Sequence, residues 1–256
     1  QFHAPETWGL GMGFRISQSP FADGDDSISD IYPLFYYENG DFFHAGLEAG
    51  YRLFKGSHWT AGPIARYRFF DVPENYLDRD WRDALDLGWR FSLRFSPSFK
   101  TGSKMLSDTE GNFHANLKPK FSFAGDGWKV EPYAFARWKS DDFNNYYYGL
   151  DIERPGDGID FTFGVDARLH LFSNLYLLGG ATLTFLDPDA SDVSFVNRSA
   201  TGTLFAGIGL FDDEQKPPAG KLKSRPYVRL AHGWATESAL SEILTFQGAE
   251  SDHDNQ

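Results

Sequence analysis

The chain has 256 residues, which fits one large domain or two small ones, and it lacks cysteine, which excludes disulfides, zinc-thiolate sites and Cys nucleophiles. Its net charge of −12 argues against nucleic acid as a partner. Aromatic residues make up 17% of the chain, yet its mean hydropathy of −0.44 is typical of a water-soluble protein.

A transmembrane β-barrel reconciles these two values, because a barrel turns large apolar side chains toward lipid and keeps polar side chains inside. The longest uncharged apolar run covers residues 175–186, whereas a membrane-spanning helix needs about 20 residues. The chain begins at Gln1 without a charged-then-apolar leader, so we expect an export signal to have been removed.

Period-two alternation of apolar and polar residues is the main pattern, and it predicts an all-β, antiparallel transmembrane barrel. The segments that follow the pattern are 8–16, 31–37, 43–54, 59–70, 85–95, 99–106, 113–123, 128–138, 143–150, 161–171, 175–185 and 200–211. They predict about 12 strands, with about 10 as the fallback if residues 99–106 form a loop.

The alternation is clearest in residues 43–54, which we interpret as one strand. Its predicted lipid-facing side chains are Phe43, Ala45, Leu47, Ala49, Tyr51 and Leu53. Its predicted inward-facing residues are His44, Gly46, Glu48, Gly50 and Arg52.

Turn-forming residues separate the segments and predict which barrel end each connection occupies. Asn39-Gly40 and Ser173-Asn174 are tight-turn signals, which we assign to the periplasmic end. The long polar links 18–30 and 187–198 then lie outside the cell. Residues 71–80 are long where a short turn is expected, and we interpret them as a periplasmic lobe.

The barrel is predicted to cover residues 1–211, with a polar linker and a strand-and-helix tail in residues 212–256. Gly207, Gly209 and Phe211 resemble the terminal signal by which outer-membrane barrels are recognised for assembly. That signal normally closes the polypeptide. The tail is therefore either a periplasmic appendage or the start of a truncated second module, and we favour the second interpretation.

Inward positions of the predicted strands collect basic residues, whereas acidic residues gather in the links. The predicted basic cluster of the lumen comprises Arg52, Arg66, Arg68, Arg90, Arg94, Lys118, Lys120, Arg137 and Arg168. A basic lumen attracts anions by simple electrostatics. We favour a second interpretation, in which the lumen is packed and ion-paired, with Glu48, Asp86, Glu131 and Asp166 as partners.

Other polar residues predict neither a metal site nor a cofactor nor catalysis. His44, His114 and His170 are predicted to face inward, but their spacing does not bring them together. The acidic residues 23–26 lack a full calcium-loop pattern. His232 and Ser238 are close in sequence but lie outside the predicted barrel, and no nucleophile elbow is present.

Aromatic residues near the segment ends predict an interfacial girdle, and a sugar-binding platform is the weaker interpretation. The girdle residues are Trp59, Trp81, Trp128, Trp138 and Tyr146 to Tyr148.

Several short motifs, in order and spacing, resemble the MipA/OmpV family of outer-membrane proteins over residues 8–211. They are PLFYYEN at 33–39, AGLEAGYRL at 45–53, ARYRF at 65–69, NNYYYG at 144–149, RPG at 154–156 and LGGA at 178–181. The resemblance implies a barrel that acts as a scaffold between a lytic transglycosylase and a bifunctional penicillin-binding protein. Other family members are described as adhesins or porin-like proteins. The tail after Phe211 departs from the family ending.

Three hypotheses follow for the function. The first is a non-enzymatic barrel of the Gram-negative outer membrane, surrounded by lipid and lipopolysaccharide, that docks peptidoglycan enzymes. The second is a small anion-preferring pore, and the third is a barrel enzyme that acts on lipid. The sequence leaves the oligomeric state open.

Overall fold

The computed structural model describes residues 7–22, 27–68 and 84–212. The strands are β1 (Thr7–Gln18), β2 (Ser27–Asn39), β3 (Phe42–Ala45), β4 (Glu48–Tyr51), β5 (Phe54–Lys55), β6 (Trp59–Arg68), β7 (Ala84–Ser96), β8 (Phe99–Ser107), β9 (Phe113–Phe121), β10 (Phe123–Gly125), β11 (Trp128–Lys139), β12 (Gly158–Phe172), β13 (Leu175–Phe185) and β14 (Ala200–Asp212). The helices are α1 (Asp141–Tyr147) and α2 (Pro188–Ser191).

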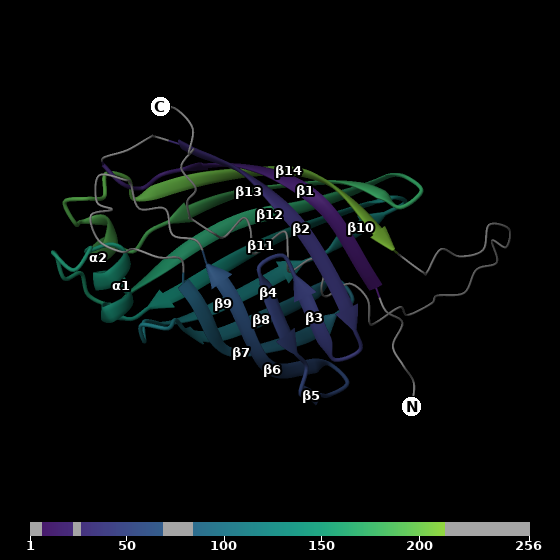
Figure 1. The fold of residues 1–256 in the computed structure, drawn as a ribbon, viewed down its shortest axis with the longest axis horizontal. Coiled ribbons are helices and arrows are strands. Elements are labelled where there is room, and N and C mark those ends of the chain that lie inside the picture. Colours follow the sequence, from purple (N-terminus) through teal and green to yellow (C-terminus); the bar gives the residue numbers. More distant parts are fainter. Residues whose placement is uncertain (1–6, 23–26, 69–83, 213–256) are drawn as a thin grey trace, which may run out of the picture.

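These strands form one antiparallel sheet that closes on itself (Figure 1). Each strand pairs with the next along the wall, and β14 pairs with β1 from Trp8↔Asp212 to Ser17↔Thr203. Because β4 and β5 share one place in the wall, and β9 and β10 another, the barrel has 12 strand positions. Closure pairs the backbone N–H and C=O groups that an open sheet edge would expose to lipid. The predicted fold class is confirmed.

Two of the predicted strands are wrong, and their errors cancel in the strand count. Residues 43–54 form the β3–β4 hairpin, because Gly46 has a φ of 59° and begins a two-residue turn between Ala45 and Glu48. The turn reverses the predicted phase, so Phe43 and Ala45 face the interior at 3% and 0% exposure.

Residues 143–150 are not a strand but include most of helix α1. Ser140 caps this helix, and its hydroxyl accepts a hydrogen bond from the Phe143 N–H at 3.1 Å. Asp141 and Asp142 in the first turn add favourable interactions with the helix dipole. Local capping therefore outweighs the strand propensity of the tyrosines.

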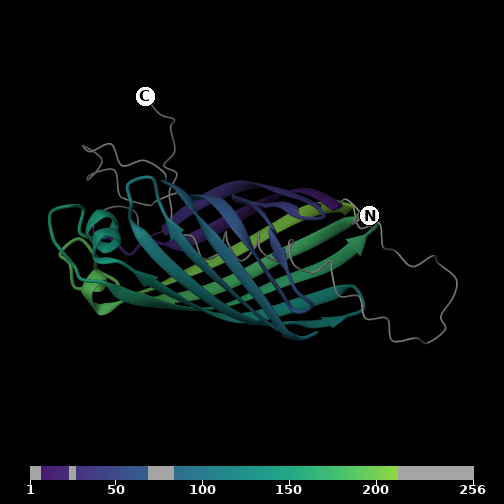
Figure 2. The same cartoon turned by 90° about the horizontal axis from the view of Figure 1, so that it is seen from below.

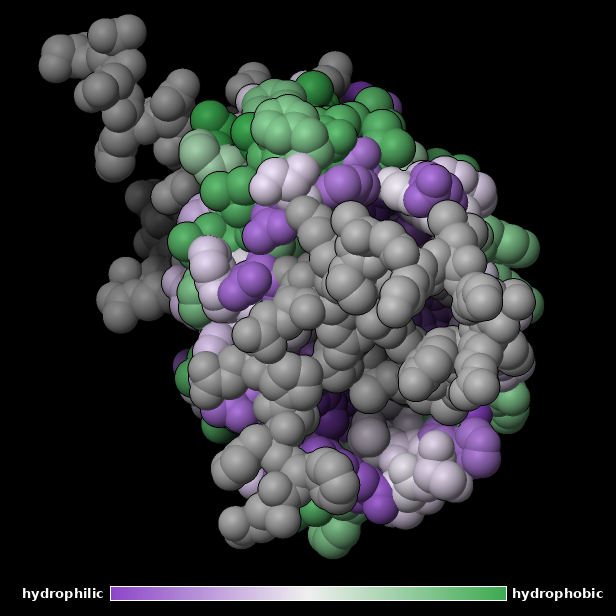
Figure 3. All heavy atoms as spheres, turned by 90° about the vertical axis from the view of Figure 1, so that its right-hand side faces the viewer, coloured by the Kyte–Doolittle hydropathy of each residue, from purple (hydrophilic) through white to green (hydrophobic). Residues whose placement is uncertain are grey.

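Side chains along each strand alternate between lipid and the interior. In β1, Trp8, Leu10 and Met12 are exposed on the outside, whereas Gly9 and Gly13 lie inside. Figure 3, which looks at one end of the barrel, shows hydrophobic residues on the outer surface and hydrophilic residues nearer the centre. The helices of the described residues are too short and too polar to cross a bilayer.

The two ends of the barrel differ. One, here the loop end, carries α1, α2 and the links around them, and the other, the turn end, carries the tight turns, the start of β1 and the end of β14 (Figures 1 and 2). Residues 71–80 lie outside the described residues, but the flanking residues Arg68 and Ala84 lie at the loop end, next to α1. Because residues 43–54 are two strands, these flanking residues lie at the opposite end from the one that the single-strand interpretation gives them.

Other predictions concern residues that the structure does not describe. They are the tail beyond Asp212 with His232 and Ser238, the acidic residues 23–26, and Trp81.

Candidate functional site

The interior wall carries many charged side chains. All nine residues of the predicted basic cluster occupy inward positions of the strand alternation or of the turn that follows β4. Further basic residues that the sequence interpretation missed also face inward. They are Arg15, Lys100, Lys104, Lys129 and Lys139. The sequence could have predicted that Lys100 and Lys104 face inward together, because residues four positions apart lie on the same side of a strand.

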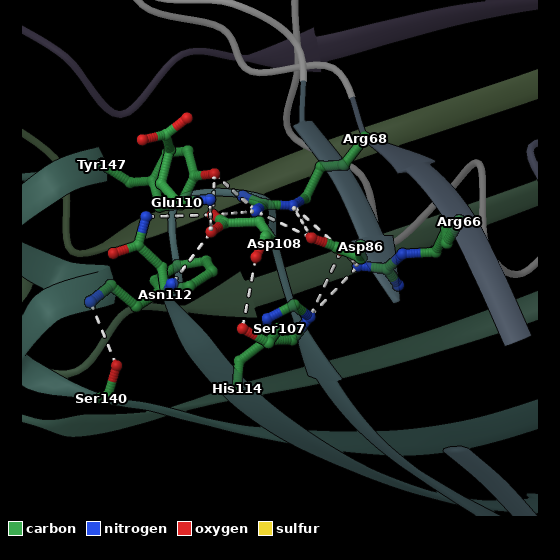
Figure 4. A network of polar contacts seen from close by, with 11 residues as sticks. Arg66, Arg68, Asp86, Ser107, Asp108, Glu110, Asn112, His114, Ser140 and Tyr147 are labelled. Atoms are coloured by element: carbon green, nitrogen blue, oxygen red, sulfur yellow. Dashed lines mark hydrogen bonds and ion pairs between the residues drawn. The ribbon is translucent and has the colours of Figure 1, made fainter. Parts of the chain in front are cut away.

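A buried polar network joins the wall to helix α1 at the loop end (Figure 4). Asp86 accepts hydrogen bonds from Arg66 and Arg68, both at 3.0 Å. Arg68 also reaches Asp108 at 3.2 Å and donates to the Tyr147 hydroxyl at 2.6 Å. Tyr147 in turn donates to Asp108 at 2.5 Å. Since these side chains are almost fully buried, each charge depends on its partners for stabilisation.

Burial raises the pKa of the Tyr147 hydroxyl well above its usual range, and the hydrogen bond to Asp108 acts in the same direction. The hydroxyl therefore keeps its proton and continues to donate to Asp108. In this way Tyr147 connects α1 to β6 through Arg68 and to the turn after β8 through Asp108.

His114 lies beneath this network and is fully buried. Its Nε2 is 3.4 Å from Arg66 and 3.6 Å from Asp86, and its ring meets Phe143 edge-on at 5.1 Å. His44 instead packs on the outward-facing ring of Phe35, which corrects its predicted inward position. The described residues contain no group of three or more potential metal ligands.

A second buried ion pair holds α2. Lys139, which is fully buried, lies 2.7 Å from Asp160 and 2.5 Å from Asp187. Asp187 also caps α2 by accepting from the Ala190 N–H at 2.8 Å. Burial alone would raise the pKa of Asp187, but Lys139 and the capping hydrogen bond outweigh burial and hold the pKa below its usual value.

An apolar cluster covers this polar layer at the loop end. Its buried members are Phe21, Ala84, Phe143, Tyr147, Tyr148, Leu186, Ala190, Val193 and Val196. Two backbone hydrogen bonds join the β1–β2 link to the β13–β14 link there. The Ala22 N–H donates to the Phe195 carbonyl at 2.7 Å, and the Asn197 N–H donates to the Pro20 carbonyl at 2.9 Å. We call this cluster, with α1 and α2, the loop-end cover. The burial of Tyr147 and Tyr148 in the cover is inconsistent with their predicted place in a lipid-facing girdle.

The seam between β14 and β1 contains the predicted assembly residues. Gly209 and Gly207 pair with Gly11 and Gly13, and Phe211 pairs with Gly9. The ring of Phe211 lies against Gly9, where a Cβ would overlap it. Gly13 makes the same room for the Phe205 ring. Glycines on one strand therefore let aromatic rings of the other lie flat against the inner wall.

The interior supports ion pairing and packing, and its acids are engaged with bases. Glu48 pairs with Arg90 at 3.1 Å and with Lys104 at 2.5 Å, and Glu38 pairs with Arg52 at 2.6 Å. The Arg15 Nε donates to Asp30 at 3.0 Å.

Comparisons with known proteins add a family relationship. The model of the family described as "MltA-interacting protein MipA" matches residues 10–210. The chain is 23% identical over 227 residues to the MltA-interacting protein of Escherichia coli (strain K12), which covers 80% of this chain and 90% of that protein. The MltA-interacting protein of Shigella flexneri matches with the same values.

Among solved structures, similar chains include two porins. The KdgM porin aligns with a TM-score of 0.40 and 9% identity, covering 80% of this chain and 98% of that chain. The NanC porin aligns with a TM-score of 0.43 and 9% identity, covering 79% and 98%.

Proposed function

The chain belongs to the MltA-interacting protein (MipA) family, and from this premise we propose that it is a non-enzymatic scaffold of the outer membrane that docks a peptidoglycan-remodelling enzyme. The family match over residues 10–210 carries the proposal. The relatives' name points to an interaction with MltA, a peptidoglycan lytic transglycosylase.

The loop-end cover favours a scaffold function and disfavours an open channel. Buried ion pairs and an apolar cluster occupy the mouth that a channel needs open. The turn end is the docking face in this proposal. Both ends of the barrel sequence, Thr7 and Asp212, lie there, which is the arrangement of barrels whose termini face the periplasm. On this face residues 53–59 are exposed, and Lys55 forms an ion pair with Asp41.

Binding of the purified barrel to a purified MltA-type lytic transglycosylase tests the proposal. We expect binding by the native barrel and a loss of about tenfold in affinity when Lys55 and His58 are both replaced by Glu, because a docking face loses complementarity when its charges are reversed. Glu110→Lys, an exposed substitution at the loop end, is the matched control and should bind normally. Absence of binding by the native barrel would refute docking, and equal losses in both variants would refute the turn end as the docking face.

An anion-preferring pore is the second candidate, favoured by the basic side chains along the interior wall. Planar-bilayer recordings test it. If the barrel is a pore, it conducts anions better than cations, and Arg94→Ala reduces that preference because it removes an inward-facing charge. A silent native barrel would eliminate this candidate.

A further inference from the structure

Basic side chains face each other directly across neighbouring strands near the turn end. Arg94 on β7 is paired in register with Lys100 on β8, and Lys100 is paired with Lys120 on β9. One strand further along, Lys129 on β11 is paired with Arg168 on β12. All five residues occupy inward positions, and we call them the basic row. Like charges placed directly opposite each other destabilise a sheet.

Two carboxylates of the described residues lie against this row. Glu131 is 3.2 Å from Lys129, 3.5 Å from Lys120 and 3.7 Å from Lys100. Asp166 is 3.2 Å from Lys120. These two acids are themselves opposite each other in register, and Lys120, which contacts both, offsets their mutual repulsion. Within the described residues, these two carboxylates thus serve a row of five basic groups.

The loop end is more evenly balanced. There Lys139 has two carboxylates, Asp160 and Asp187, and Arg68 also has two, Asp86 and Asp108. The excess of positive charge is thus a local property of the turn-end half of the lumen. The overall acidity of the chain, with a net charge of −12, does not extend to it.

Two side chains of the basic row are also more exposed than Lys139 at the loop end. The side chains of Lys100 and Lys129 each keep 19% of their surface exposed although they face inward, whereas Lys139 keeps none. These two amines are therefore accessible to water, whereas the side chain of Lys120 between them is 5% exposed. The loop-end cover leaves the turn end as the side of approach among the described residues.

We propose that the basic row is a binding site for a ligand with a phosphate monoester group, which enters from the turn end. Amines on β8, β9 and β11 converge on the carboxylate of Glu131, and a compact group that carries between one and two negative charges with several acceptor oxygens can bridge them beside or in place of that carboxylate. Such a ligand offsets the repulsion within the row. The proposal goes beyond the scaffold function and does not depend on it.

The ligand can be a soluble phosphate ester or the head of a single-chain lipid. The strand order places β1 and β14 across the barrel from β8 and β7. Phe205 and Leu178 present apolar side chains to the interior, beside their in-register neighbours Arg15 and Arg168, and an alkyl chain bound to the row can lie against them. The two sources are separated by the choice of probe.

Calorimetric titration of the barrel in a neutral maltoside detergent is the test, with glycerol phosphate as the soluble probe and dodecyl phosphate as the amphiphilic one. We expect at least one to bind, and we expect Lys100→Gln or Lys129→Gln to weaken binding about tenfold, as for the loss of one charged hydrogen bond. Lys104→Gln is the matched control, because Lys104 is on the same strand and face but pairs with Glu48. Glu131→Gln should strengthen binding, since it removes a competing carboxylate.

Binding of both probes assigns the site to a phosphate group alone, and binding of dodecyl phosphate only assigns it to a lipid. Binding of neither probe overturns the proposal. Equal losses in the Lys100 and Lys104 variants, or no gain in Glu131→Gln, also overturn it. The heat-modifiable gel mobility of folded barrels confirms that each variant has assembled, and Lys129→Gln keeps the test valid if Lys100→Gln does not fold.

Discussion

At the scale of single residues, the buried network around Arg68 shows what sequence reasoning found and what it missed. Arg68 was predicted to face inward, and Asp86 was predicted as an ion-pair partner. Asp108 was not assigned, because it lies in a short turn, and Tyr147 was assigned to the lipid-facing girdle, because its segment was interpreted as a strand. Their separations from Arg68, 40 and 79 residues, leave no local signal of the contact.

Tyr147→Phe tests the importance of this network. The substitution removes the hydroxyl that donates to Asp108 and accepts from Arg68, so two buried charges lose a partner. We expect the loop-end cover to lose about 1–3 kcal/mol of stability. Faster proteolysis of the links around α1, at unchanged barrel content, measures the loss. Tyr37→Phe, at a half-buried turn-end tyrosine whose hydroxyl accepts a hydrogen bond from Asn39, is the control, and equal proteolysis in both variants would contradict the role of Tyr147.

At the scale of elements, the β3–β4 hairpin shows how one turn changes the interpretation of a whole segment. A two-residue turn shifts the alternation by one residue, but the sequence hides this shift because the inward-facing Phe43 and Ala45 are apolar and continue the apolar period. The positive φ of Gly46 makes the difference. The turn keeps Glu48 in its predicted inward position, where it pairs with Arg90 and Lys104, and brings Phe43 and Ala45 to the same side.

Gly46→Ala tests the hairpin. A Cβ at a φ of 59° costs about 1–2 kcal/mol, and the hairpin completes the wall between β2 and β6. We therefore expect a smaller fraction of folded barrel in a refolding assay by gel mobility. Gly102→Ala is the matched control, since the nearest atoms to its added Cβ are 3.9 Å away. If both variants refold equally well, the turn does not require glycine.

At the scale of the whole molecule, the seam between β14 and β1 decides whether the sheet becomes a barrel. The aromatic rings of Phe205 and Phe211 need the bare backbone of Gly13 and Gly9 beside them. Gly13→Val is expected to force the Phe205 ring away and to cost about 1–3 kcal/mol by overpacking. Urea-unfolding midpoints measure this cost. Adding Phe205→Ala should recover part of the loss, and no recovery would contradict the packing argument.

Sequence alone determined the fold class, the inward direction of the basic residues and the family resemblance. Strand alternation and family motifs are local, so they can be read without knowing which strands are neighbours. The tertiary structure decided which charges meet. Lys100 and Lys120, 20 positions apart in the numbering, become cross-strand neighbours only through the register of β8 and β9. Likewise, α1 covers the loop end because residues of the β1–β2 and β13–β14 links, with Ala84 at the start of β7, pack around it, and no single segment contains that information.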